Sequence, residues 1–362
     1  MSAVARFLKT QVINCSSFFV VGALFTGGYA LQQKAHAATT EVNGPKVTWS
    51  VSLHGNRRGQ TEGLEKLKAI LEQKTSGNFQ LQLHYGEALS SVRDVLQNIR
   101  IGAFEMGLFC AAYDPSKVPA LSGLELPFIP ANQNEFLDRV ALEEAYIHHP
   151  AVLGELRDRW NAQPIIMGTL PSWRIMGVGE APESLEDLDG LRMYAAPMEG
   201  MLYQEFGAVI TTVTAPELFQ AMEKGIVEAA SWPWTYAFFS YGINELADWY
   251  STDFGGVIGR SPCPIVANKR AFDSLPPQYK KLIEDSKGEA YRWQAEQYEQ
   301  VDKANLQVLD SQGMVEVSFD KERLDSATET LKQKIWGTWI KERDEQGLPG
   351  NELATLLEKE SF

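Results

Sequence analysis

The sequence has few of the residues that build disulfide frameworks or metal sites. Its 362 residues include three cysteines and five histidines. Cys15, Cys110 and Cys263 lie far apart along the chain, which excludes a disulfide network and a zinc knuckle. Cys110 and Cys263 are flanked by apolar or small residues, and we expect both to be buried free thiols. The sequence also permits a disulfide between them but does not indicate one.

Motifs of the common enzyme classes are missing as well. There is no G-x-S-x-G, H-x-x-x-H, C-x-x-C or G-x-x-x-x-G-K-[ST], and no complete G-x-G-x-x-G. The chain therefore offers no recognisable nucleophile, metal-binding set or phosphate loop. We predict that it is not an enzyme and that it needs no metal and no cofactor. An exported α/β enzyme is the less favoured alternative.

Positive charge is scarce. The chain has 33 Lys and Arg against 47 Asp and Glu, which gives a net charge of -14. A surface of this sign repels phosphate backbones and anionic lipid head groups. The composition therefore argues against nucleic acid as a partner.

No apolar run is long enough for a comfortable membrane span of about 20 residues. The N-terminus has instead the layout of a secretory signal. Arg6 and Lys9 come first, an uncharged and largely apolar stretch covers 13–25, and Ala35-His36-Ala37 offers a cleavage site. We predict a signal peptide over residues 1–37, cleavage after Ala37 and a periplasmic protein. An uncleaved membrane anchor is the alternative.

From residue 47 the pattern alternates between strand and helix, which predicts an α/β fold with parallel strands. Ser90 is expected to cap the second helix. The predicted strands cover 47–53, 79–85, 104–110, 164–169, 173–178, 191–195, 209–213, 226–231 and 314–319. The predicted helices lie around 64–71, 90–99, 134–148, 152–160, 199–206 and 216–224, and a charged helical region ends the chain.

One helical pattern is much longer than the others and runs from Pro277 to about Gln312. At 1.5 Å per residue a helix of this length reaches roughly 50 Å, more than a single lobe. We therefore predict that it packs across two lobes and ties them together. Residues 255–267, rich in Gly and Pro, are long enough to run between the lobes.

Short stretches spread over the chain form an ordered set. They are LHYGEAL at 83–89, RDVLQ at 93–97, IGAFEM at 101–106, LPF at 126–128, LEDLDGL at 185–191, PELFQAM at 216–222 and GIVEAA at 225–230. Together they resemble the solute-binding proteins of TRAP (tripartite ATP-independent periplasmic) transporters, of the DctP type. The resemblance covers nearly all of the chain after the predicted signal.

The resemblance implies a two-lobed periplasmic-binding-protein fold with hinge strands and a long helix spanning both lobes. The lobes are expected to close over a small solute, which is then delivered to the membrane permease subunits of the transporter. We expect lobe I to comprise 38–168 with about 257–300, and lobe II 169–256 with about 301–345. Residues 346–362 are expected to form a C-terminal helical extension.

Ligand contacts in the family fall on loops that match this chain at His54, Asn56, Arg57 and Arg93. A characteristic arginine of the family, in the pattern G-L-K-I-R-V-P, clamps the solute carboxylate, and here an ungapped match places Tyr194 at its position. Three interpretations stay open. The strand register slips, Arg174 or another basic residue substitutes, or the solute is held without the usual clamp.

The segment after Ala230 also departs from the family. Some members have a Glu-Trp pair whose carboxylate holds a cation, but this chain has Ser231-Trp232, which argues against a bound metal ion. The dense aromatic residues here form either a hydrophobic support under the cleft or a wall that stacks on a ring or cradles a methylammonium head. The candidate wall residues are Trp173, Tyr194, Trp232, Trp234 and Tyr236.

We therefore predict the periplasmic receptor of a TRAP transporter for a small organic acid. A zwitterionic, quaternary-ammonium or ectoine-like solute in an aromatic cleft is the alternative ligand class. A sensor or scaffold on the same fold is a further alternative.

Overall fold

A computed structural model describes residues 41–129, 136–211, 213–252 and 261–358. The predicted signal peptide and its cleavage site at Ala37 lie outside the described residues, as do residues 255–260 of the predicted connection at 255–267. Residues 263–267 of that connection belong to a strand, Cys263–Asn268. Within the described ranges, no helix is both long enough and apolar enough to cross a membrane.

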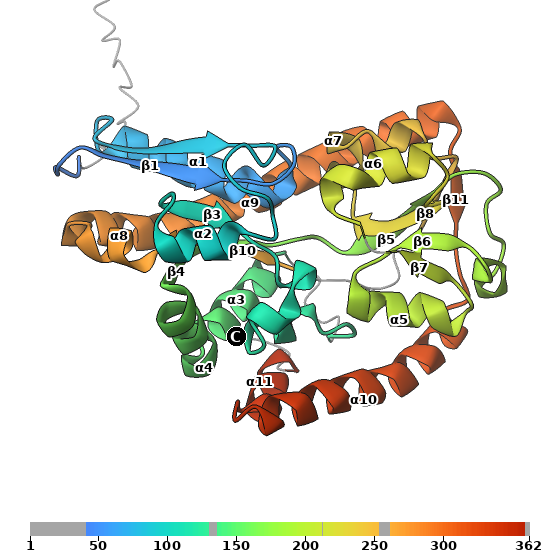
Figure 1. The fold of residues 1–362 in the computed structure, drawn as a ribbon. Helices are drawn as coiled ribbons and strands as arrows, with labels where there is room; N and C mark the ends of the chain where they lie inside the picture. The colour runs from blue at the N-terminus through green and yellow to red at the C-terminus, as the bar shows by residue number, and fades with distance from the viewer. Residues whose placement is uncertain (1–40, 130–135, 212, 253–260, 359–362) are drawn as a thin grey trace, which may run out of the picture. The chain divides into compact units, whose positions relative to one another are not determined.

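The first sheet has five strands in the order β2-β1-β3-β10-β4. The strands β1, β2 and β3 are parallel, as the sequence predicted, whereas β10 runs antiparallel to both β3 and β4. This sheet therefore collects the N-terminal strands and one strand from late in the chain (Figure 1). The strands are β1 (Val47–Ser52), β2 (Phe79–His84), β3 (Met106–Leu108), β4 (Ala162–Gly168) and β10 (Cys263–Asn268).

Helices and short helical turns accompany this sheet. The apolar face predicted for the first helix is buried, with Leu64, Leu67 and Leu71 almost fully covered. Ser90 does not cap the second helix, because its hydroxyl bonds the Ser91 carbonyl and the helix starts only at Val95. The elements are α1 (Gly59–Lys74), α2 (Val95–Ile101), η1 (Ala111–Tyr113), η2 (Pro115–Lys117), η3 (Leu121–Glu125), α3 (Phe136–Ile147), α4 (Pro150–Gly154), η4 (Glu155–Arg159) and α8 (Lys269–Ser274).

The second sheet has six strands in the order β11-β9-β5-β8-β6-β7. The strand predicted over 226–231 lies instead at 229–233, because the amides of Ile226 and Val227 bond the Ala221 carbonyl and close the preceding helix. The strands are β5 (Trp173–Gly177), β6 (Arg192–Tyr194), β7 (Val209–Thr211), β8 (Ala229–Pro233), β9 (Trp249–Ser251) and β11 (Val315–Val317). The helices are η5 (Leu185–Leu188), α5 (Pro197–Glu205), α6 (Ala215–Glu223), α7 (Tyr236–Ser240) and η6 (Ile243–Glu245).

The long helix α9 (Pro277–Gln312) has the bounds that the sequence predicted. It packs on α1 and α3 beside the first sheet and on α7 beside the second. Gln294 of α9 donates to the carbonyls of Gly59 and Thr169, at 3.0 and 3.1 Å. Eight residues further along α9, Asp302 accepts a hydrogen bond from the Thr235 amide at 2.7 Å. The helix therefore ties both sheets together, as Figure 1 shows.

A second long helix, α10 (Lys321–Glu345), also reaches both sheets. Near its start Arg323 pairs with Glu186 of η5. Toward its end the indole nitrogens of Trp336 and Trp339 donate to Pro127 and Ser122, at 2.8 and 3.0 Å. The sequence assigned this helix to lobe II alone, but it ends on the side of the first sheet. The last helix, α11 (Gly350–Leu357), packs on α3 and η3.

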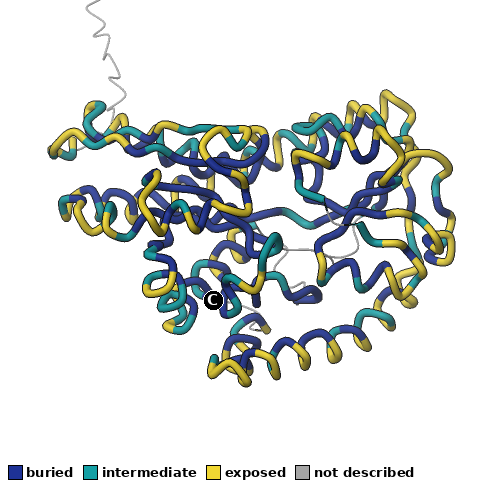
Figure 2. Tube along the Cα trace, in the orientation of Figure 1, coloured by how far each residue is buried: buried dark blue, intermediate teal, exposed yellow. Residues whose placement is uncertain are grey.

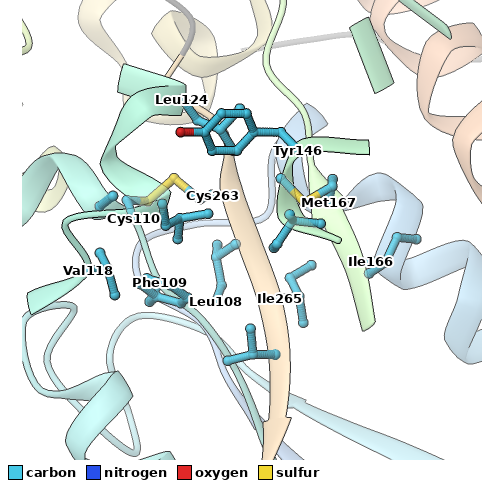
Figure 3. Packing of buried hydrophobic residues seen from close by; sticks show 14 of the residues in the cluster. Leu108, Phe109, Cys110, Val118, Leu124, Tyr146, Ile166, Met167, Cys263 and Ile265 are labelled. Atoms are coloured by element: carbon cyan, nitrogen blue, oxygen red, sulfur yellow. A yellow bond between two sulfur atoms is a disulfide. The ribbon is translucent and has the colours of Figure 1, made fainter. Parts of the chain in front are cut away.

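The core contains one covalent link that the sequence analysis did not predict. Cys110 and Cys263 form a disulfide with their Cα atoms 4.4 Å apart, so the expectation of two free thiols was wrong (Figure 3). The antiparallel register pairs Ile265 with Leu108, so Cys263, two residues before Ile265, comes opposite Cys110, two residues after Leu108. The inner strands of both sheets are buried, whereas the outer faces of the helices are exposed (Figure 2).

Candidate functional site

A cavity with about 670 Å³ of empty space, part of it open to solvent, is lined by residues from both sheets. The first-sheet side contributes the loop after β1, the start of α1, η1 and the disulfide. The second-sheet side contributes the ends of β5, β6 and β8. Its principal lining residues are His54, Arg58, Gln60, Tyr113, Cys110, Cys263, Trp173, Tyr194, Ala196, Trp232, Ala237 and Tyr298.

Arg58 provides the positive charge of this cavity and is only 5% exposed. It precedes α1, where the chain leaves the end of β1, the usual place for ligand contacts in α/β folds. One terminal nitrogen of its guanidinium donates to the carbonyls of His54 and Asn56, both at 2.9 Å. The other lies 2.9 Å from His54 Nε2 and 2.5 Å from Gln60 Oε1. All of these partners are neutral.

The neighbouring Arg57 has a different environment. It forms a bidentate ion pair with Glu62, with distances of 2.8 and 2.9 Å. Its side chain is 55% exposed, and it does not line the cavity. Of two adjacent arginines, one is therefore neutralised by the protein and the other faces the cavity without a carboxylate among the described residues.

His54 stands beside Arg58 and is 2% exposed. Burial, and secondly the positive charge of Arg58, hold the pKa of His54 well below its ordinary value. The imidazole is therefore neutral at neutral pH. It contributes an edge-on ring contact to Tyr113, with ring centroids 5.9 Å apart, but no charge.

The second-sheet wall of the cavity is aromatic. Trp173 begins β5, Tyr194 ends β6, and Trp232 lies in β8 between them in the sheet order. The rings of Tyr194 and Trp232 meet edge to face with centroids 6.3 Å apart. The indole N–H of Trp173 is buried without a hydrogen-bond partner. These rings line the second-sheet side of the cavity, and Arg58 lines its first-sheet side.

A buried carboxyl group is hydrogen-bonded to the strand that carries Trp232. Glu199 of α5 accepts hydrogen bonds from Ser231 of β8 at 2.5 Å and from Tyr203 at 3.1 Å. Burial raises the pKa of the Glu199 carboxyl to about 7, although hydrogen bonds from Ser231 and Tyr203 oppose the shift. Near neutral pH this group is therefore partly protonated.

Replacing Glu199 with glutamine is expected to weaken the pH dependence of stability. A carboxyl whose pKa is raised by folding stabilises the native state below its unfolded pKa, and this contribution is lost as pH rises through about 7. The loss is about 3 kcal/mol for a shift from the ordinary 4.5 to about 7. Urea unfolding at pH 4.5 and pH 8 measures it. Glu205→Gln, an exposed position on α5, is the control. Equal pH dependence in wild type and Glu199→Gln would contradict this assignment.

Among the residues named from sequence, the structure brings His54, Trp173, Tyr194 and Trp232 to the cavity. Asn56 and Tyr236 instead join the two sides directly, because Asn56 donates to the Ser240 carbonyl at 2.7 Å and the Tyr236 hydroxyl donates to Glu62 at 3.2 Å. These two residues therefore lie beside the cavity and do not line it.

The remaining named residues, including both arginines considered as clamps, lie elsewhere. Arg93 donates to the Tyr113 carbonyl at 2.8 Å on the outer surface. Arg174 stacks over Trp234 at 4.5 Å, in a separate hollow that includes Asp302. Arg93, Arg174, Trp234 and the paired Arg57 do not line the cavity.

Sequence reasoning missed Arg58, Gln60, Tyr113 and Tyr298. The only available signal for Arg58 was its place in the same loop as His54 and Arg57. Tyr298 comes from α9, which was expected to join the lobes and for which no role in the site was predicted. Over the described part of the chain, no group of three or more His, Cys, Asp or Glu side chains is placed to hold a metal ion.

The sequence of this chain matches a known protein family. The model of the family "Bacterial extracellular solute-binding protein, family 7" (DctP) matches residues 52–342. Among curated relatives, the monocarboxylate 2-oxoacid-binding periplasmic protein of Nostoc sp. is 22% identical over 327 residues, which cover 88% of this chain and 85% of the relative.

Solved structures share the fold at low sequence identity. A TRAP solute-binding protein from a marine metagenome, described as specific for aromatic acid ligands and bound to 3-hydroxybenzoate, superposes with a TM-score of 0.73 at 18% identity and covers 87% of this chain and 98% of that one. A TRAP solute-binding protein from Rhodoferax ferrireducens with copurified benzoate gives a TM-score of 0.74 at 18% identity, over 86% and 97% of the two chains. The two-lobed fold predicted from the sequence is thereby confirmed.

Proposed function

The chain belongs to the bacterial extracellular solute-binding proteins of family 7, and from this premise we propose that it is a TRAP transporter receptor that binds a small organic acid in the cavity between its two sheets. The observation that carries this proposal is the lining of the cavity by residues of both sheets. A solute that contacts both sides stabilises the closed arrangement through its differential affinity for it. Release of the solute to the permease then requires only that the two sides separate.

Two observations support an organic acid as the bound solute. The similar structures are described as holding benzoate and 3-hydroxybenzoate, which are carboxylates. The cavity of this chain carries the positive charge of Arg58 and no aspartate or glutamate among its described lining residues. That charge would repel the cationic head of a zwitterionic, quaternary-ammonium or ectoine-like solute despite the aromatic walls, so this alternative has less support.

We propose that the solute leaves chemically unchanged. Binding and release require no nucleophile or general base, and the aromatic wall and buried guanidinium are suited to recognition of an anion with an apolar body. The lobe boundary expected between residues 168 and 169 also remains a proposal. It is supported by β4 ending at Gly168 in the first sheet and β5 beginning at Trp173 in the second.

Export to the periplasm, with cleavage after Ala37, is part of the same proposal. It is supported by the layout of residues 1–37 and by the disulfide, since disulfides persist in oxidising compartments. N-terminal sequencing of the protein from a periplasmic extract is expected to start at Ala38. A start at Met1 in the membrane fraction would favour the anchor instead.

A thermal-shift screen tests the receptor function. The protein purified from the periplasm is mixed with aromatic monocarboxylates, 2-oxo acids, dicarboxylates, sugar acids and quaternary ammonium compounds. An acid present at a hundred times its Kd is expected to stabilise the fold by about 2.7 kcal/mol and so to raise the Tm. NMR of the acid after incubation is expected to show it unaltered. Turnover of a substrate, or a response only to cations, would contradict the proposal.

A further inference from the structure

We propose that Arg58 is the anion clamp of the cavity and that the solute is a monocarboxylate whose remaining part is apolar. This inference rests on the proposed receptor function and adds to it the residue and the ligand class. The head group is expected on the side of His54 and Gln60, and the body against the aromatic wall of Trp173 and Trp232.

The positive charge of Arg58 has no negatively charged partner among the described residues. Its guanidinium is buried, and its hydrogen-bond partners are two carbonyls, an amide oxygen and an imidazole nitrogen. None of these groups can carry a negative charge. Buried charges in proteins are ordinarily paired. A carboxylate in the cavity would supply the missing partner.

The guanidinium of Arg58 has one edge that can receive a carboxylate. The two carbonyl bonds fix one terminal nitrogen on the protein side. The Nε–H has no hydrogen-bond partner among the described residues, and it lies on the same edge as the nitrogen that contacts the Gln60 amide. This edge can take a carboxylate through two parallel hydrogen bonds. The carboxylate would replace Gln60, and the charged bond is stronger than the neutral one.

The rest of the cavity lining is largely apolar. Leu170, Ala196, Pro197, Ala215 and Ala237 surround the aromatic wall with apolar surface. The described lining residues include no lysine and no second arginine, so a second carboxylate would be buried without a positively charged partner. A dicarboxylate therefore fits poorly, and a monocarboxylate with an apolar body fits well.

Arg57, Arg93 and Arg174 contact other parts of the protein. Arg57 is held by Glu62 at 2.8 Å, and Arg174 stacks on Trp234 in the separate hollow. Arg93 lies over the outer side of Tyr113 at 6.0 Å from its ring centroid. Among the described residues, Arg58 is the one arginine that lines the cavity.

The test is calorimetric titration of the protein purified from the periplasm, as wild type and as Arg58→Gln, Arg58→Lys and Arg192→Gln. Arg192 is a surface residue paired with Glu228 at 2.7 Å and serves as the matched control. The probes are benzoate, 3-hydroxybenzoate, phenylacetate and pyruvate, each with its uncharged amide, together with phthalate, succinate, galacturonate and betaine. Melting of each variant by circular dichroism verifies that it is folded.

We expect at least one monocarboxylate to bind wild type and its amide to bind about a hundredfold more weakly. Arg58→Gln should lose the same hundredfold for the acid while binding the amide as wild type does, a pattern that a merely structural role would not give. Arg58→Lys should lose part of the affinity, and Arg192→Gln none.

The outcomes separate the two proposals. If a monocarboxylate binds folded Arg58→Gln as tightly as wild type, the clamp is wrong and the receptor function stands. Binding of phthalate, succinate or galacturonate in preference to every monocarboxylate overturns the ligand class. Preference for betaine, or no binding by any probe, overturns the acid receptor itself. If both Arg58 variants fail to fold, the wild-type preference for acid over amide decides, and its absence counts against the clamp.

Discussion

Replacing Cys110 and Cys263 together by alanine is expected to lower the free energy of unfolding by about 2–5 kcal/mol. The disulfide joins residues separated by 153 positions, so its loss frees a large loop in the unfolded chain. Both sulfurs also lie in the packed interior near Leu108 and Ile265, where their loss leaves space (Figure 3). Urea unfolding with the slope compared between variants measures the effect.

Unfolding of wild type in a reducing agent is the control for this experiment, because it breaks the bond without changing the packing residues. We expect it to be destabilised in the same direction as the double alanine variant. Equal stability of the oxidised and reduced proteins would show that the bond contributes nothing to the fold. The alanine variant would then report only the lost side-chain volume.

Trp232→Ala is expected to weaken binding of the acid by more than tenfold, equivalent to about 1.4 kcal/mol. Trp232 is 5% exposed and lies on the cavity between Tyr194 and Tyr241, with ring centroids 6.3 and 4.9 Å away. Its removal takes away the surface on which an apolar body packs. Calorimetric titration with the acid selected by the screen measures the loss.

Packing and binding roles of Trp232 can be separated by a matched pair. Trp232→Phe and Trp249→Phe each shrink a buried indole of the second sheet, but Trp249 does not line the cavity. Both variants should unfold at lower urea concentration, and only Trp232→Phe should bind the acid more weakly. Unchanged affinity in Trp232→Phe and in folded Trp232→Ala would assign Trp232 to packing alone.

Elements with strong periodicity were predictable from the sequence. The helix over Pro277–Gln312 lacks internal proline and keeps its apolar spacing, so its bounds were predicted correctly. The parallel order around β1 followed from the alternation of strand and helix. The start of α2 was missed because Ser90, which has the right chemistry for a cap, bonds within its own turn.

The site was less accessible to sequence reasoning, because it depends on contacts between distant segments. Arg57 and Arg58 are adjacent and chemically identical, and only the folded chain determines that Glu62 pairs with Arg57. The disulfide likewise depends on β3 and β10 becoming antiparallel neighbours. Tyr194 and Trp232 were named from the family resemblance and Trp173 as a further aromatic wall residue, and the strand order brings the three together.

A crystal structure of the protein with the tightest-binding acid from the screen tests the central claim most directly. It should place the carboxylate within hydrogen-bonding distance of the Arg58 guanidinium and the body of the acid against Trp232, so that one small molecule contacts residues of both sheets. An acid seated outside this cavity, or held by residues of one sheet alone, would contradict a receptor that closes around its solute.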